Sequence, residues 1–299
     1  MQFIYRLTVI LVVLSTSLAK GQNGIVVFQS DFGLKDGAVS AMKGVALGVS
    51  PSLKLEDLTH EIPAYNIWEA AYRLHQTVPY YPKGTVFVSV CDPGVGTERR
   101  SVVMLTKSGH YIVTPDNGTL TLLAEHLGIA EVRTIDEAIN RLKNSGASYT
   151  FHGRDVYAYT AARLAAHIIR FQQIGPKLTS DIVRLDYQKA VYKKEGVVQG
   201  NIPVLDVQYG NVWSNIPRTL IDQLGVKSGE SVRVQIFHGD TTLYNKTVRL
   251  VNTFGEAASG DDVAYMNSLL NFSIAVNQGN FSEKYNVMSG PAWTIVVGK

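Results

Sequence analysis

Residues 85–100 read TVFVSVCDPGVGTERR, an apolar β-branched run that passes directly into a loop rich in glycine and charge. Short runs of this kind, bounded by turn residues, are typical of buried β-strands. Residues 25–29 (IVVFQ) and 111–114 (YIVT) have the same character. Apolar residues with helical spacing lie around and between these runs, at 39–47, 66–78, 119–127 and 156–171. This alternation predicts an N-terminal α/β domain with a mainly parallel sheet.

The pattern changes after about residue 190, where helical periodicity largely disappears. Short strand-like runs follow, separated by Gly, Asn and Asp, at residues 197–198, 202–207, 232–237 and 247–251. Such spacing predicts an all-β C-terminal domain, a compact barrel or sandwich, and we expect a barrel. The expected domain ranges are 1–19 for a signal peptide, 24–185 for the α/β domain and 192–299 for the β-barrel domain.

The first residues have the features of a secretory signal. Arg6 supplies a positive charge, residues 7–14 (LTVILVVL) form a short apolar segment, and small residues stand at Ser17 and Ala19. The apolar segment is too short to span a bilayer, which needs roughly 20 residues. We therefore expect an exported protein, periplasmic or secreted, that starts near Lys20 after cleavage and has no membrane segment.

Composition narrows the function classes. The chain has 299 residues, of which 45% are hydrophobic and 18% are charged, and its formal net charge is +3. Without a long basic run, nothing predicts a nucleic-acid partner. Cys91 is the single cysteine. It therefore forms no intramolecular disulfide, and a Cys/His zinc site of the usual kind is not supported.

Four polar clusters stand at the ends of expected strands, and the fourth of them, at residues 151–155, precedes a helix. Ligands of open α/β sheets bind outside the carboxyl ends of the strands, and in a parallel sheet these ends share one rim. Each cluster alone is also typical of a turn or a helix cap. The loop after Cys91 lacks the Gly-Lys-Ser/Thr ending of a P-loop and a GxGxxG pattern, but it holds an acid, Asp92, and Arg99. The four clusters are residues 30–36, 92–99, 115–118 and 151–155.

Together these segments resemble the S-adenosylmethionine-cleaving family that includes the hydroxide adenosyltransferases, the fluorinases and the chlorinases. The resemblance implies an α/β domain followed by a β-barrel domain, and a homotrimer with active sites between subunits. It also implies a small-molecule substrate, S-adenosylmethionine, and neither a metal nor a separate cofactor. The matching segments are SDFG with Asp36, NIWEAA, GTVFVSVCDPGVGTERR, PDNG, TFHGRD, DVQYGNVWSNI (206–216) and NSLLNFSIAVNQG (267–279).

The resemblance also implies roles for individual residues. The hydroxide-using branch has an Asp-Arg-His set, matched here by Asp92, Arg99 and His152. Halogenating relatives have a tyrosine in place of Asp92, and the fluorinase has a serine in place of Gly153, so water is the expected nucleophile. Leu269 and Val276 stand where the fluorinase has arginines. The substrate-binding residues implied are Asp31 and Asp36, Tyr65 near the sugar, and Asp206, Tyr209, Asn211 and Ser268 from the second domain.

The expected reaction is hydrolysis of S-adenosylmethionine to adenosine and L-methionine by attack of activated water on C5′ of the ribose. Two alternatives remain at this point. One is a non-catalytic nucleoside-binding module. The other is an exported metal-dependent hydrolase that uses His60, Asp92, His152 and Asp155.

Overall fold

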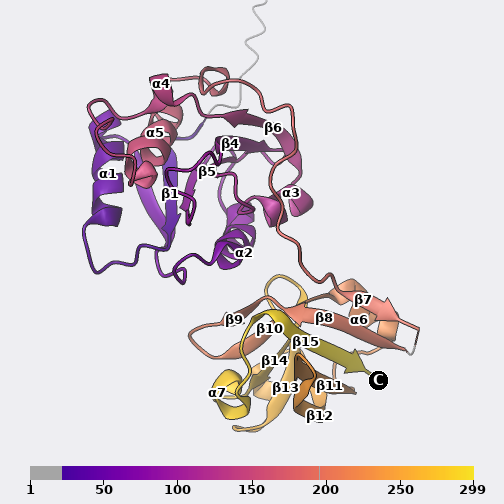
Figure 1. Ribbon diagram of the computed structural model, residues 1–299. Helices are drawn as coiled ribbons and strands as arrows, with labels where there is room; N and C mark the ends of the chain where they lie inside the picture. The colour runs from indigo at the N-terminus through magenta and orange to yellow at the C-terminus, as the bar shows by residue number, and fades with distance from the viewer. Residues whose placement is uncertain (1–21, 195) are drawn as a thin grey trace, which may run out of the picture.

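The structure is a computed structural model that describes residues 22–194 and 196–299. The signal peptide expected at residues 1–19 lies outside the described residues. Within the described ranges, no helix combines the length and apolar character needed to cross a bilayer. The chain forms two sheets that occupy separate halves of the molecule, the first in indigo to magenta and the second in orange to yellow (Figure 1).

The first sheet is mixed. Its described strands have the order β2-β1-β3-β5-β4-β6. The pairs β1–β2, β1–β3 and β3–β5 are parallel, whereas β4 pairs antiparallel with both β5 and β6. The expected mainly parallel sheet is therefore not confirmed, because a tight hairpin at residues 107–110 reverses the chain between β4 and β5. The bounds are β1 Ile25–Ser30, β2 Lys54–Thr59, β3 Val86–Val90, β4 Ser101–Thr106, β5 Tyr111–Pro115 and β6 Ile129–Thr134.

Helices cover both faces of this sheet. Side chains alternate along a strand, so Val26 and Phe28 face one helical layer while Val27 faces the other. Helices α1 and α5 pack on the first face, and α2 and α3 on the second. Burial on both faces explains why the inner strands β1, β3, β4 and β5 are largely apolar, whereas the edge strands β2 and β6 carry charged residues. The bounds are α1 Ala38–Val49, α2 Ile67–Thr77, η1 Val78–Tyr80, α3 Thr121–His126, α4 Glu137–Asn140, η2 Gly153–Ala158, α5 Tyr159–Ala165 and η3 Phe171–Gln173.

The helix expected at residues 156–171 differs from the one observed. A π-helical turn, η2, begins earlier at Gly153 and continues into α5, which ends at Ala165. The expectation was wrong at the C-terminal end because His167 has φ 58°, a left-handed conformation that cannot continue a right-handed helix. The π-turn lies next to His152, and such turns often occur at functional sites.

The second sheet has the described order β7-β8-β15-β11-β12-β13-β14-β10-β9. It curls so that β10 approaches β8, where the Asn201 amide donates to Asn215 Oδ1 at 2.8 Å. No pairing among the described residues joins β7 to β9, so a closed barrel is not confirmed. The bounds are β7 Val191–Lys193, β8 Val197–Ile202, β9 Val204–Asp206, β10 Asn211–Pro217, α6 Arg218–Leu224, β11 Ser231–His238, β12 Thr241–Val251, η4 Phe254–Glu256, β13 Asp262–Met266, β14 Asn271–Val276, α7 Phe281–Tyr285 and β15 Gly290–Gly298.

Helix α2 joins the two halves. The Trp68 indole donates to the Pro203 carbonyl at 3.1 Å, and Arg73 donates to the Leu205 carbonyl at 3.3 Å. Trp68 also packs against Tyr187, with ring centroids 4.9 Å apart. These contacts place the residues just before α2 near the edge of the second sheet.

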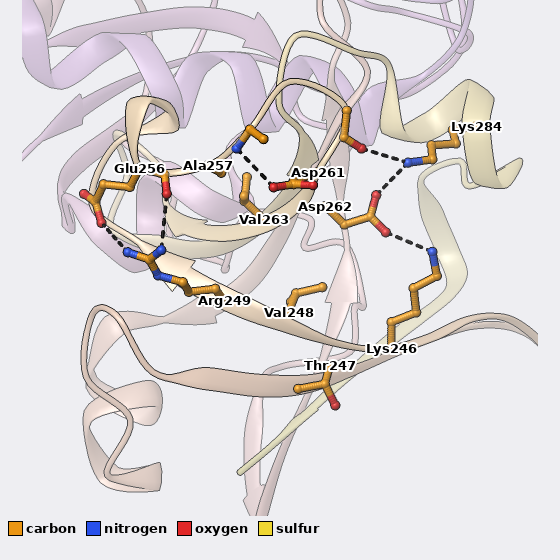
Figure 2. Close-up of a pocket in the computed structure, with 12 residues that line it drawn as sticks. Lys246, Thr247, Val248, Arg249, Glu256, Ala257, Asp261, Asp262, Val263 and Lys284 are labelled. Carbon is orange, nitrogen blue, oxygen red and sulfur yellow. Dashed lines mark hydrogen bonds and ion pairs between the residues drawn. The ribbon is translucent and has the colours of Figure 1, made fainter.

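A polar cluster around Asp262 ties β12, β13 and α7 together. Asp262 accepts hydrogen bonds from Tyr244 at 3.0 Å and Tyr285 at 2.6 Å, and it pairs with Lys246 at 3.2 Å and Lys284 at 2.9 Å. The cluster borders a groove of about 430 Å³ in which Arg249 also reaches Glu256 (Figure 2). The charges of this groove neutralise one another, so we treat it as structural.

Candidate active site

Asp92 and Arg99 form a buried ion pair at the end of β3. The loop turns back on itself, with φ 79° at Gly96, a conformation that favours glycine. Arg99 Nε then donates to Asp92 Oδ1 at 2.9 Å, and Nη2 donates to Oδ2 at 2.5 Å. The two side chains are 11% and 5% exposed. Burial alone lowers the pKa of Arg99, but the hydrogen bonds to Asp92 outweigh it and raise that pKa, so the pair is ionic.

His152 stands just before the π-turn and is buried. Its Nδ1 lies 3.1 Å from the Tyr149 carbonyl oxygen, and its Nε2 lies 3.3 Å from Arg141 Nη2 and 3.6 Å from Glu137 Oε2. A carbonyl only accepts hydrogen bonds, so Nδ1 carries a proton. In the neutral ring, Nε2 is then the acceptor and faces the Arg141 guanidinium.

Ser101 and Glu137 connect these two parts of the site. Arg99 Nη1 donates to Ser101 Oγ at 3.1 Å, and Ser101 donates to Glu137 Oε1 at 3.2 Å. Glu137 Oε2 accepts from Arg141 Nη2 at 2.5 Å. We call this continuous set the Asp92–His152 network; its members are Asp92, Arg99, Ser101, Glu137, Arg141 and His152.

Asp92 and His152 share a cavity of about 280 Å³ with Asp31 and Tyr65. Asp31 Oδ2 accepts from the Tyr65 amide at 2.9 Å and lies 3.6 Å from Cys91 Sγ. Burial and the neighbouring Asp31 charge raise the pKa of Cys91, so the thiol stays protonated and donates to that carboxylate. Tyr65 has φ 67°, and its residue is 73% exposed. The remaining walls are formed by Phe32, Ala64, Val90, Val95, Thr150, Phe151 and Gly153.

A second cavity of about 630 Å³ lies in the C-terminal half and shares no lining residue with the first. Asn211 Nδ2 donates to Asp206 Oδ2 at 3.3 Å. Among the described residues that line it, Asp206 is the only charged one. Aromatic rings form one wall, where the Trp213 indole donates to Tyr265 at 3.1 Å. The expected residues that line this cavity are Asp206, Tyr209, Asn211 and Ser268, together with Val276.

Two residues singled out from the sequence lie elsewhere. Asp36 is exposed and accepts from the Ala38 amide at 2.9 Å at the start of α1, so it is not brought into either cavity. Leu269 packs in an apolar cluster between the two halves with Trp68 and Trp213. Both positions are therefore explained by local structure.

The residues of the metal-dependent alternative are not gathered into one group. His60 lies 2.7 Å from Ser30 Oγ and 3.0 Å from Asp57 Oδ1. Asp155 pairs with Arg154 at 2.6 Å. Across the part of the chain that the structure describes, no cluster of three or more His, Cys, Asp or Glu residues is placed to hold a metal ion.

Comparison with known proteins agrees with this geometry. Residues 26–175 match the family model of the SAM hydroxide adenosyltransferase N-terminal domain, and residues 200–294 match that of the C-terminal domain. A relative named (R)-S-adenosyl-L-methionine hydrolase, from Methanocaldococcus jannaschii, is 38% identical over 72% of this chain and 74% of its own length. A fluorinase from an Actinoplanes species is 29% identical over 91% of this chain and 97% of its own length.

A solved structure has the same fold. The crystal structure of an uncharacterized conserved protein from Thermotoga maritima superposes with a TM-score of 0.85 and 34% identity, covering 92% of this chain and 100% of that one. This chain belongs to the SAM hydroxide adenosyltransferase family. In this chain Asp92, Arg99 and His152 belong to one network, and Asp92 and His152 line the first cavity.

Gly153 lies at the wall of this cavity and is closely surrounded by other side chains. A Cβ at position 153 would lie 3.2 Å from Met42 Sδ and from Val90 Cγ1, and 3.3 Å from Phe32 Cε2. These contacts are tighter than ordinary van der Waals packing. A side chain at this position therefore requires its neighbours to move, which favours glycine in this member of the family.

The sequence analysis missed Ser101, Glu137, Arg141 and Tyr157. Tyr157 is fully buried, and its hydroxyl lies 3.5 Å from Asp92 Oδ2. Burial raises the pKa of Tyr157, so the hydroxyl stays protonated. One residue could have indicated the position of Glu137 from the sequence. Asp136 accepts from the Ala138 amide at 3.0 Å and caps α4, the short helix that begins at Glu137.

Proposed function

We propose that this protein hydrolyses S-adenosyl-L-methionine to adenosine and L-methionine, with Asp92, Arg99 and His152 as the catalytic residues. The observation that supports this most directly is the Asp92–Arg99 ion pair facing a cavity that also contains His152 and Asp31. Family membership and the hydrolase names of relatives support the same reaction. No separate cofactor or metal is included in the proposal.

The reaction is a displacement at C5′ of the ribose. A water gives one proton to a base of the site, Asp92 or His152, its oxygen bonds to C5′, and the C5′–sulfur bond breaks with its electron pair going to sulfur. Methionine leaves as a neutral thioether, so the leaving group needs no acid. The difficulty is the water, whose pKa in bulk is about 15.7. A positioned acceptor contributes typically about 10²–10⁴-fold.

The buried ion pair suits this task for two reasons. Arg99 donates to both oxygens of the Asp92 carboxylate and orients it, while Asp92 still lines the cavity. The approach of hydroxide to a sulfonium cancels two opposite charges, so a site with apolar walls favours the transition state over the charged reactants. Phe32, Val90 and Val95 provide such walls.

The substrate-binding residues are proposed from the two cavities. Asp31 would accept hydrogen bonds from the ribose hydroxyls, with Tyr65 against the sugar. Asp206 would pair with the methionine ammonium, and Tyr209, Asn211 and Ser268 would contact the rest of the ligand. Asp36 is also a proposed substrate contact. Its carboxylate lies in the exposed segment before α1 and lines neither cavity, so this contact is not part of the cavity lining. Among the described residues that line the cavity at Asp206 there is no cation for the methionine carboxylate, and Val276 stands where the resemblance implies an arginine.

We infer that a complete site forms between copies of the chain in a homotrimer. The two cavities share no lining residue, and Tyr65 and Tyr209 are 73% and 64% exposed. Mixing two inactive variants, Asp92→Asn and Asp206→Ala, tests this directly. Sites between subunits restore about a quarter of the activity on random assembly. Sites within one chain restore none.

Export and the domain limits also remain proposals. We propose that residues 1–19 are cleaved, that the mature protein is periplasmic or secreted, and that the domains span 24–185 and 192–299. Mass spectrometry of the mature protein should find a start near Lys20. Detection of only the full chain beginning at Met1 would contradict export.

One incubation tests the activity itself. Purified protein is given S-adenosylmethionine in ¹⁸O-water, with and without EDTA. The expected result is adenosine labelled at the 5′-hydroxyl, unlabelled methionine and no effect of EDTA. Loss of activity with EDTA would favour a metal-dependent hydrolase, and binding without turnover would indicate a nucleoside-binding module.

A further inference from the structure

We propose that Glu137 is a positioning residue that holds His152 and Arg99 in one fixed arrangement and supplies the counter-charge for a protonated His152 ring. This inference rests on the proposed function for its catalytic consequence. The assignment of Glu137 to His152 rests on geometry alone.

The backbone fixes where Glu137 starts. The Ile135 amide donates to the Ser101 carbonyl at 2.8 Å, which pins the segment before α4 against the start of β4. Asp136 then caps α4 and directs the Glu137 side chain towards the same strand. Arg99 lies two residues before Ser101, so Glu137 reaches the Asp92–Arg99 pair through a single hydroxyl.

The two oxygens of the Glu137 carboxylate have different partners. Oε1 accepts from Ser101, and Oε2 accepts from Arg141 and faces His152 Nε2 at 3.6 Å. Its interaction with His152, opposed by burial and helped by Arg141, lowers the pKa of Glu137 to about 2. The group is therefore an anion throughout the neutral range. Glu137 lines neither cavity, so it acts through its neighbours.

Arg141 and Glu137 serve different states of the ring. When His152 is neutral, Nε2 accepts from Arg141 at 3.3 Å. When the ring is protonated, its Nε2–H faces the Glu137 carboxylate, while Nδ1–H still donates to Tyr149. Arg141 itself is held by Glu137 and by the Tyr149 ring, 4.7 Å from its guanidinium carbon. Protonation of Nε2 therefore exchanges Arg141 for Glu137 as its hydrogen-bond partner, because arginine cannot accept.

Other charged or titratable groups around His152 do not replace this role. Tyr157, from the π-turn, has its ring 6.4 Å away, and Tyr149 has its ring 6.5 Å away. Asp92 shares the cavity but is engaged by Arg99. Among the described residues that contact the ring, Glu137 is the anion at ion-pair distance.

The decisive experiment is a nuclear magnetic resonance titration of the His152 ring protons in the full-length protein, without substrate. The signal is assigned by its loss in His152→Asn. Removing the anion in Glu137→Gln should move the titration midpoint to lower pH by about half a unit or more. The matched control is Glu131→Gln, which also removes a partly buried carboxylate paired with arginine, Arg133 at 2.6 Å, but lies outside the network.

Activity provides the second readout. In Glu137→Gln, kcat should fall about tenfold with KM for S-adenosylmethionine changed less than twofold, and the pH profile of kcat should shift with the ring titration. Ser101→Ala, a smaller change that leaves Arg141 in place, should lower kcat about threefold. Thermal melting of every variant shows whether the fold is kept.

The outcomes separate the two proposals. An unmoved His152 midpoint in folded Glu137→Gln, or an equal shift in Glu131→Gln, would overturn the role of Glu137 whatever the enzyme does. A shifted midpoint in a protein that does not hydrolyse S-adenosylmethionine would support the role of Glu137 and reject the proposed function. If Glu137→Gln does not fold, Ser101→Ala decides: normal kcat overturns the proposal and reduced kcat with unchanged KM supports it.

Discussion

Two carboxylates that each lie in a charged cluster, Asp92 in the α/β half and Asp262 in the C-terminal half, differ in what surrounds them. Asp262 accepts from four donors on different elements, and its groove is lined by charges that pair with one another (Figure 2). Asp92 takes its strong donors from Arg99 alone and lines a cavity with apolar walls. The apolar walls beside the carboxylate, rather than its charge, distinguish the Asp92 cluster from the Asp262 cluster.

The same substitution in each cluster tests this comparison, and the larger effect on turnover is expected at Asp92. Asp92→Asn keeps the size of the side chain and one acceptor for Arg99 but removes the negative charge. Turnover of S-adenosylmethionine should fall about 10²-fold or more, measured by adenosine release. KM should change much less because the ribose and methionine contacts lie elsewhere.

A triple variant tests whether Asp92, Arg99 and His152 act together. If Asp92, Arg99 and His152 act as one unit, their single replacements should be strongly non-additive. The triple alanine variant should then be little slower than the slowest single variant. Near-normal turnover in any single variant would make that residue structural, and the mechanism would have to omit it.

At Asp262 the expected loss is in stability. Asp262→Asn should leave turnover normal and lower the free energy of unfolding by about 1–2 kcal/mol, measured by urea denaturation at neutral pH. Burial raises the pKa of Asp262, but its hydrogen bonds to Tyr285, Lys284, Lys246 and Tyr244 outweigh this and lower it. The contribution is therefore present above about pH 4, the unfolded value, and is lost as pH falls through the lower native pKa. A difference between the proteins that persists at pH 2 would contradict this account.

The parts of the site predictable from sequence were those that follow strand ends. Asp31 follows β1 and Asp92 follows β3, which are parallel neighbours, so both side chains reach one rim. The PDNG segment after β5 lies at this rim too, but its groups are used by the structure. Asp116 pairs with Arg100, and Asn117 donates to the Cys91 carbonyl at 2.8 Å. The sequence alone could not distinguish the polar residues that line the cavity, Asp31 and Asp92, from those whose groups are used within the fold, Asp116 and Asn117.

Other features of the fold and of the candidate site could be recognised only in the folded structure. Helix α4 has four residues, too few to show periodicity, so Glu137 had no signal of its own beyond its Asp136 cap. Strand β4 follows the Asp92 loop without a break, and its antiparallel direction depends on the short hairpin at residues 107–110. The exposure of Tyr65 and Tyr209 also depends on how the two halves are arranged.

A smaller effect on turnover is expected at the cavity wall. Gly153→Ser places a side chain against Met42, Val90 and Phe32 and should lower kcat/KM roughly 5- to 10-fold by shifting the cavity. Gly44→Ser is the control, because Gly44 also lies in a helical segment but has open space around it. Incubation in high chloride should still give adenosine. If 5′-chloroadenosine became the main product in the wild-type protein, the assignment of water as nucleophile would be reversed.

The smallest effect is expected at Cys91, whose thiol contacts the proposed site at Asp31. Its protonated thiol lies 3.6 Å from Asp31 Oδ2, a weak contact with the proposed ribose acceptor. Cys91→Ala removes this donor and should raise KM about two- to threefold with kcat unchanged, because the Asp92–Arg99 pair is untouched. Cys91→Ser keeps a donor of similar size and should restore KM. A fall in kcat in Cys91→Ala, with KM normal, would instead show that the thiol supports the water-activating residues. Cys91, which follows β3, would then have to be grouped with the catalytic residues rather than with the proposed ribose-binding residue Asp31.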